Sequence, residues 1–462
     1  MACTRLFLLT EPTLMHRALL VSEILLEVFM HVNKVLDPYA SILSYREISL
    51  ARKSFAALAR TCKPFYEPAM DLLWAELDGI EPLLGCVTRL HPIVYRRGRA
   101  SRHLCFEVIE PLSEHEVTQF LHHAPRVRSL RILHDDYFHL LSALPIETCM
   151  FPRLLSLSTD RNLTRYLHLF LSPMLRCCTL PVVHPDLKSV PICCAALEDL
   201  SIKSSFENTA ADGRVLYDSI RLCQRLVTLA CPPLDWTTWE YLSNLPTLLT
   251  LEIWDDRCSL GSRNVNLAPF LNVTRLYFYT RRAAYTITVM QHLEFPSLNQ
   301  FEMDVFNLPW ADIEPLFHAL SQHKTLSHIT ISSERGDREL QDLLGSSSTP
   351  IRQSLCFMQL RTLRFKFPYC CINLDDDLLL EAMSSWPHIR MLQFIDPRAI
   401  PTVTFHGLFT ALHQCPRLHT LDIPLDAVNI NIDPTAELFL HTSLRNLNLT
   451  SSALSDAEAV AR

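Results

Sequence analysis

The side chains in this sequence that could bind a metal ion fall into two groups. His122 and His123 are adjacent and lie near Cys105, and imidazole and thiolate are ligands that zinc prefers. The run Asp375 to Asp377 could bind a cation through its carboxylates. The sequence favours simpler roles for both groups. The histidines fit a polar helix end, and the aspartates fit the start of the helix that follows, where negative charge is stabilised.

Cysteines and one arginine cluster are the other candidates for chemistry. Cys149, Cys223 and Cys415 close apolar helical stretches, where a cysteine usually serves as small buried filler and not as a nucleophile. The basic run Arg96 to Arg99, with Arg102 after it, could clamp a phosphorylated peptide. We prefer to interpret this run as a solvated loop.

Sequence motifs of catalysis are missing. The chain contains no Gly-x-Gly-x-x-Gly, no Walker-type loop, no Gly-x-Ser-x-Gly, no His-Glu-x-x-His and no paired Cys-x-x-Cys set. It has only 8 glycines, which argues against glycine-rich phosphate loops. We therefore expect no enzymatic activity, no cofactor and no bound metal.

Two apolar stretches near the N-terminus have helical spacing. The first runs from Leu20 to Val32, and its apolar face consists of residues three and four apart: Ile24, Leu25, Val28, Phe29 and Val32. The second runs from Phe55 to Trp74 and is interrupted by Pro64. Helices of this size bury too little surface to be stable alone. Their apolar faces must pack on another surface.

These stretches match a known pattern. The residues Glu23 to Phe29 fit the opening Leu-Pro-x-Glu-Ile/Leu-Leu-x-x-Ile-Phe, Ala59 to Phe65 fit Ala-x-x-Cys-x-x-Phe, and Ala69 to Trp74 fit Ala-x-Asp-x-Leu-Trp. The segment thus resembles an F-box, in the form common in fungal F-box proteins. It departs from that pattern in having Val21 at the usual proline position and a longer connection from Val32 to Phe55.

The resemblance implies a partner. By resemblance, an F-box docks on the Skp adaptor of a cullin-RING ubiquitin ligase. The residues assigned in this way to adaptor contact are Leu20, Ile24, Leu25, Val28, Phe29, Leu58, Cys62 and Phe65. Some of them must instead fill the domain's own core, and the sequence does not divide the two groups. The alternative is a hairpin that only caps the rest of the chain, in a scaffold for protein–protein interaction outside any ligase.

From about residue 125 the chain repeats a pattern that reads Pro-x-Leu-x-x-Leu-x-Ile. Its clearest copies begin at Pro246, Pro296 and Pro416. About thirteen units begin between Val127 and Leu444, with a mean spacing of about 26 residues. This spacing and the Leu-x-x-Leu-x-Leu signature are typical of leucine-rich repeats. The asparagine that usually follows the strand is mostly missing, so the turns should be irregular.

The sequence therefore predicts an α/β protein. A helical F-box-like domain is followed by an irregular leucine-rich-repeat solenoid, with a parallel sheet on the concave side and helices on the convex side. The predicted divisions are an N-terminal tail (1–15), the F-box-like domain (16–74), a linker and N-terminal cap (75–124) and the solenoid (125–462).

In each repeat strand, the residue between the last two apolar positions should point outward. Those that we propose as substrate-binding residues are Arg131, Glu252, Tyr277, Glu302, Arg364, Gln393 and Asp422. The same position in other repeats holds Ser201, Thr330 and Asn448. Because this set is mixed in charge and includes an aromatic ring, it suits a protein partner better than a polyanion.

Composition limits the remaining possibilities. The 462 residues are 48% hydrophobic, which is enough for a large core. The net charge of −7 gives no general attraction to nucleic acid or to an anionic membrane. No apolar run is long enough for a spanning helix or a secretion signal. We expect a cytoplasmic or nuclear protein that recognises an unidentified protein substrate.

Overall fold

The computed structural model describes the parts of the chain on which the fold and the site depend. These are residues 21, 24, 27–29, 44–96, 109–144, 149–160, 166–203, 210–254, 267–335, 348–367, 373–395, 401–427, 441–449 and 453–454. The chain divides into two compact units, Met1–Cys178 and Thr179–Arg462.

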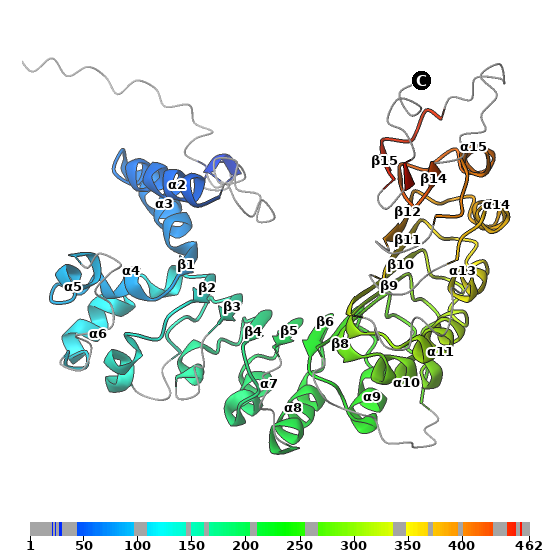
Figure 1. Cartoon of the computed structure of the whole chain (residues 1–462). Helices are drawn as coiled ribbons and strands as arrows, with labels where there is room; N and C mark the ends of the chain where they lie inside the picture. The colour runs from blue at the N-terminus through cyan, green and yellow to red at the C-terminus, as the bar shows by residue number, and fades with distance from the viewer. Residues whose placement is uncertain are drawn as a thin grey trace, which may run out of the picture. The chain divides into compact units, whose positions relative to one another are not determined.

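Unit 1 begins with helices and continues into the sheet (Figure 1). Its helices are α2 (Ser44–Leu58), α3 (Lys63–Ala75), α4 (Glu81–Leu84), α5 (His91–Arg96) and α6 (Glu114–Leu121), with 3-10 turns at Ala124–Arg126, Phe138–Ala143 and Leu167–Phe170. Its strands are β1 (Glu76–Asp78), β2 (Ser129–Ile132) and β3 (Ser156–Thr159), and β4 (Cys177–Leu180) spans the boundary. The stretch expected from Phe55 to Trp74 is divided between α2 and α3. Pro64 lies in the first turn of α3, where its missing N–H costs no helical hydrogen bond.

Unit 2 alternates strands with helices. The strands are β5 (Asp199–Ile202), β6 (Thr228–Cys231), β7 (Thr250–Trp254), β8 (Arg275–Arg282), β9 (Gln300–Asn307), β10 (His328–Arg335), β11 (Thr362–Lys366), β12 (Met391–Ile395), β13 (Thr420–Asp422) and β15 (Asn446–Asn448). The helices are α7 (Ser189–Cys193), α8 (Ala210–Leu222), α9 (Trp236–Ser243), α10 (Ala284–His292), α11 (Trp310–Leu320), α13 (Thr349–Ser354), α14 (Asp376–Ser385) and α15 (Phe405–Leu412), after a 3-10 turn at Pro185–Lys188. Strands β14 (Asp426–Ala427) and β16 (Ala453–Leu454) form a separate pair.

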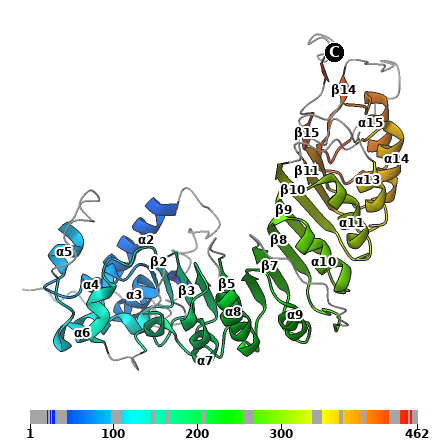
Figure 2. The same ribbon diagram turned by 60° about the horizontal axis from the view of Figure 1, so that its bottom comes forward.

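The strands form one parallel sheet of 14 strands in chain order, which confirms the predicted α/β solenoid. Each predicted repeat contributes one strand, and the remaining strand, β1, lies in the range predicted as linker and cap. In unit 2, helices α10, α11, α13, α14 and α15 follow one another along the same side of the strands (Figures 1 and 2). This arrangement follows from the right-handed crossover that joins neighbouring parallel strands.

Repeat residues on the inner strand face form a continuous core. Leu251, Ile253, Leu276 and Phe278 on β7 and β8 are fully buried, and the pattern continues on the strands that follow. Side chains alternate between the two faces of a strand, so the residues between them lie on the outer face. The apolar periodicity of the sequence therefore fixes which residues the sheet presents.

Turns before the strands are built from backbone hydrogen bonds. The carbonyl of Val227, for example, accepts the N–H groups of Leu249 (2.9 Å) and Thr250 (3.1 Å) of the next repeat. Equivalent bonds recur along the sheet and satisfy backbone groups at the entrance to the strands. In the units that begin at Pro296 and Pro416, the leucine N–H bonds to the carbonyl three residues back: Leu298 to Phe295 and Leu418 to Cys415, both at 3.1 Å. Proline thus stands at the second position of a reverse turn, which its fixed φ favours.

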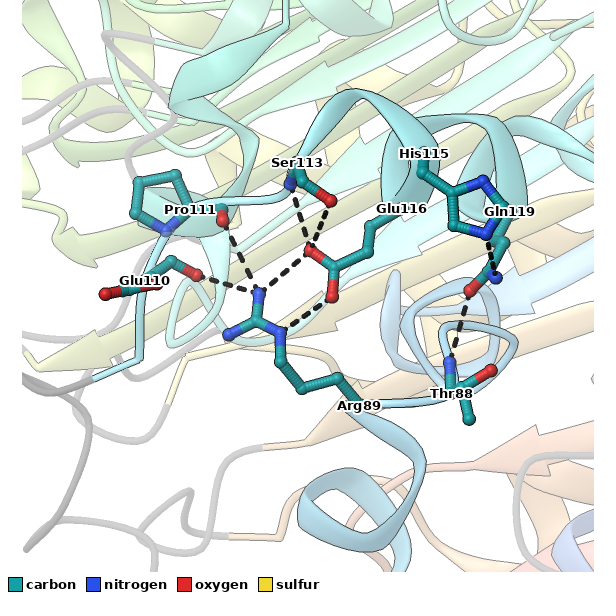
Figure 3. A network of polar contacts seen from close by, with 8 residues as sticks. All are labelled: Thr88, Arg89, Glu110, Pro111, Ser113, His115, Glu116 and Gln119. Carbon is teal, nitrogen blue, oxygen red and sulfur yellow. Dashed lines mark hydrogen bonds and ion pairs between the residues drawn. The ribbon is translucent and has the colours of Figure 1, made fainter.

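A polar network holds α6 against the segment between α4 and α5 (Figure 3). Arg89 donates to both carboxylate oxygens of Glu116 at 2.7 and 3.1 Å and to the Glu110 carbonyl at 3.1 Å. Glu116 also accepts from the N–H of Ser113, which closes a capping box at the start of α6. Its pKa is lowered to about 2, mainly by the Arg89 hydrogen bond. The network fixes the position of α6 on the segment between α4 and α5.

Helix α3 joins the sheet without a linker. It ends at Ala75, and β1 begins at the next residue. Arg126 forms ion pairs with Glu67 and Asp71 of α3, and the Arg52 guanidinium of α2 donates to the Glu76 carbonyl at 2.9 Å. These contacts fasten the N-terminal helices to the first strands of unit 1.

Trp74 of α3 also packs on His123 at this junction. Their rings stack with centroids 4.4 Å apart. Burial, together with His122 and Arg126, lowers the pKa of His123 to about 4. In the unfolded chain the imidazole binds its proton near pH 6.5, so the unfolded state gains protons first as the pH falls. We expect the melting temperature of unit 1 to decrease between about pH 6.5 and about pH 4.

Thermal unfolding of wild type and of His123→Phe across this range checks the expectation. The phenylalanine keeps an aromatic ring against Trp74 but cannot titrate, so its melting temperature should decrease less. An equal decrease in both proteins would contradict the assignment to His123.

Candidate functional site

The outer face of the sheet in unit 2 is the first candidate surface. The register places Glu252, Tyr277 and Glu302 side by side on β7, β8 and β9. The same row continues through the following strands with Thr330, Arg364, Gln393, Asp422 and Asn448. It begins at Ser201 and Ala230. The structure thus brings the proposed substrate-binding residues of unit 2 together in what we call the central row.

Two proposed residues differ from the rest. Arg131 belongs to unit 1, where it is exposed and lies between Asp78 and Ser158 on the neighbouring strands. Asp422 is in the central row but is only 4% exposed, and it accepts a hydrogen bond from the Asn448 amide at 3.2 Å. Asp422 is therefore less available to a partner than the other members of the row.

A second row on the same face adds aromatic and acidic side chains that the sequence analysis missed. Trp254, Tyr279 and Asp304 are adjacent on β7, β8 and β9. The rings of Trp254 and Tyr279 stack with centroids 4.4 Å apart and an interplanar angle of 20°. We call Glu252, Trp254, Tyr277, Tyr279, Glu302 and Asp304 the acidic-aromatic patch. All six are half-buried.

Burial and neighbouring negative charge disfavour the ionised form of the carboxylates in the patch. Burial and the nearby Glu302 raise the pKa of Glu252. Burial and Asp304 raise the pKa of Glu302, while Arg364 opposes this shift. Burial, with the same carboxylates, raises the pKa of Tyr279 to about 12. The patch therefore carries concentrated negative charge in a partly desolvated setting.

Beyond β9 the charge on this face changes sign. Arg364 and Lys366 lie on β11, and His328 lies on β10. Burial, together with Arg361 and Arg390, lowers the pKa of His328. The outer face is thus acidic and aromatic in the two rows of the patch, with Arg275 and Arg281 on β8 on either side of these rows, and basic over β11.

The N-terminal helices form the second candidate surface, with a core of their own. Phe29, Ala51, Phe55 and Ala69 are buried together, and Phe65 packs on them at 5.6 Å from Phe29 in an edge-to-face geometry. Leu58 is also partly buried against this core. We call residues 21–75 with this core the helical domain.

The helical domain also leaves apolar side chains at its surface. Ile24 and Glu27 to Phe29 are helical, and Val21, Ile24 and Val28 are exposed by 43%, 42% and 45%. Phe29 is 3% exposed and fills the core, so the structure separates it from its exposed neighbours. Cys62 is the N-cap of α3 and is half-buried. Leu20 and Leu25 lie outside the described residues.

The aspartates that were considered as a cation site make hydrogen bonds within the protein. Asp375 caps α14 by accepting from the Leu378 N–H at 2.8 Å, as predicted. Asp376 accepts from the N–H and hydroxyl of Thr404, both at 2.7 Å, and so holds the residue that caps the next helix, α15. Gly407 allows this approach, since a Cβ there would lie 2.0 Å from the carboxylate. The aspartates thus link neighbouring repeats.

Cysteine burial follows the prediction at two of three positions. Cys223 and Cys415 are buried, and burial raises the pKa of each thiol to about 12. Cys149 is exposed, so the prediction of a buried filler is wrong there, because the residue lies in a loop outside the repeat core. Cys105 and the arginines beyond Arg96 lie outside the described residues. Within the described ranges no cluster of three potential metal ligands is found.

Comparison with known proteins gives no match, either to a family model or to a curated protein. Among the helices that the structure describes, none is long and apolar enough to cross a membrane.

Proposed function

We propose that this chain is the substrate-recognition subunit of a Skp-cullin-F-box type ubiquitin ligase. The helical domain binds the Skp adaptor, and the outer face of the repeat sheet binds a protein substrate. The observation that carries the proposal is the exposure of Val21, Ile24 and Val28 beside a core that Phe29 fills.

The spacing of the exposed residues suits a docking surface. Ile24 and Val28 are helical and four residues apart, so they lie on one helix face, and Val21 lies three residues before Ile24 in a bend; we call these three residues the exposed stripe. Water contact with such a stripe costs free energy that a partner's apolar groove would recover. The F-box pattern of the sequence supplies the identity of that partner.

The protein performs no bond chemistry in this role. It acts by holding a substrate near the ligase, which raises the effective concentration of substrate lysines at the conjugating enzyme. A firm attachment of the helical domain favours such a role. The α3–β1 junction and the Arg126 ion pairs provide this attachment to the first strands.

A second candidate is a scaffold outside any ligase, in which the helical domain only caps the sheet. The contact of Arg52 with the β1 edge and the Trp74–His123 stack favour this role, because they cover the first strand and its neighbours. Adaptor binding by the full chain distinguishes the two, because removal of the helices would expose the edge of β1 under either hypothesis.

Mixing the purified full chain with a purified Skp-type adaptor tests the proposal. We expect the two proteins to co-elute as a one-to-one complex in size-exclusion chromatography. Separate elution at micromolar concentrations of both proteins would argue for the scaffold.

A further inference from the structure

The acidic-aromatic patch combines two kinds of side chain that recognise the same ligand chemistry. Neighbouring strands are about 4.8 Å apart, so Glu252 and Glu302 stand about 10 Å from each other with Tyr277 between them. In the next row, the stacked rings of Trp254 and Tyr279 lie beside Asp304. Carboxylates attract an ammonium or guanidinium group, and the faces of aromatic rings attract it as well.

Glu252 and Glu302 lack a strong counter-charge. Among the described residues, neither forms an ion pair, although Arg364 is close enough to influence Glu302. Asp304 accepts a hydrogen bond from the neutral Ser332 hydroxyl at 2.9 Å. Partly buried carboxylates that repel one another are costly in the isolated chain, and a bound cation removes this cost.

We propose that the acidic-aromatic patch binds a lysine- or arginine-bearing segment of the protein substrate. The basic side chain is held between Glu252 and Glu302, and the aliphatic part of the segment packs on Tyr277, Trp254 and Tyr279. This inference rests on the proposed function, because it states the substrate class for the sheet face assigned there.

The charges on the rest of the outer face indicate that the ligand is a protein segment. The row that carries Glu252 and Glu302 on β7 and β9 continues to Arg364 on β11. A ligand that contacts the whole row therefore needs basic groups at one end and acidic groups at the other. A small amine would satisfy only the acidic end. A polyanion such as nucleic acid would be repelled by the carboxylates.

Fluorescence anisotropy with the full chain tests the proposal. The probe is a labelled peptide of about eight residues that alternates lysine and serine, and the comparison peptide replaces lysine with glutamate. We expect the lysine peptide to bind and the glutamate peptide not to bind. Failure of the lysine peptide to bind the wild-type chain would overturn the proposal.

Two double variants locate the binding. Glu252→Gln with Glu302→Gln keeps the side-chain shape but removes the charges, and we expect about tenfold weaker binding of the lysine peptide. The matched control is Glu240→Gln with Glu314→Gln, which makes the same charge change at exposed positions on α9 and α11. Equal binding by the two variants would overturn the proposed location.

Adaptor binding measured on the same samples separates this inference from the proposed function. If every variant binds the adaptor and none binds the lysine peptide, only the inference fails. If none binds the adaptor but the patch variant alone loses the peptide, the proposed function fails and the patch remains a binding surface for basic segments.

Discussion

Replacing Ile24 and Val28 with glutamate is expected to weaken adaptor binding by at least about a hundredfold. Both side chains are exposed, at 42% and 45%, so the charges remain solvated in the free protein and leave its fold intact. In the complex the same charges would be buried without partners, which is strongly unfavourable. Calorimetric titration of the adaptor into wild type and the double variant measures the change.

Two further variants separate docking from folding. Met174→Glu places a charge at another exposed apolar position of unit 1, 52% exposed, and should bind the adaptor as the wild type does. Phe29→Ala removes a buried ring from the helical domain and should lower its melting temperature, since the loss of such a ring costs about 3–5 kcal/mol. If Ile24→Glu with Val28→Glu binds like Met174→Glu, the stripe is not the docking surface.

Replacing Trp386 with alanine is expected to lower the free energy of unfolding of unit 2 by about 3–5 kcal/mol. Trp386 is fully buried at the end of α14. Its indole N–H donates to the Ser354 carbonyl of the preceding repeat at 3.1 Å, and its own carbonyl accepts from the Ile389 N–H at 3.1 Å. The substitution would leave a large cavity between two repeats and would remove one of the two hydrogen bonds that the Ser354 carbonyl accepts, the other being from the Phe357 N–H.

Trp254→Ala is the matched control for this prediction. Trp254 is half-buried on the outer face, where it stacks on Tyr279 without filling the core. Its loss should cost about 1 kcal/mol in denaturant unfolding and should weaken binding of the lysine peptide. A similar loss of stability in both variants would show that the core is not formed as described.

The sheet could be predicted from sequence because its repeats carry a periodic signal. Each Leu-x-x-Leu unit places a strand, and its alternating residues place the inner and outer faces. β1 escaped prediction because Glu76–Asp78 is too short to carry that pattern, and only its pairing with β2 makes it a strand. Tertiary contact, not local sequence, decides such an element.

The candidate surfaces were predictable in part. The central row was predicted from one outward position in each repeat. Strands β7 to β9 extend beyond the Leu-x-x-Leu-x-Ile unit, however, and their additional outward residues Trp254, Tyr279 and Asp304 complete the patch. In the helical domain, periodicity gave one apolar face that included both Phe29 and Val28. Only the packing of Phe55 and Phe65 shows that Phe29 points inward.

The proposed ligase role depends on adaptor binding by the exposed stripe of the helical domain. Hydrogen–deuterium exchange of the full chain, with and without purified adaptor, tests it most directly. We expect slower exchange around residues 21–29 on adding adaptor, with unchanged exchange in the strands of unit 2. Unchanged exchange in the helical domain at adaptor concentrations of tens of micromolar would contradict the ligase role and leave the scaffold as the function.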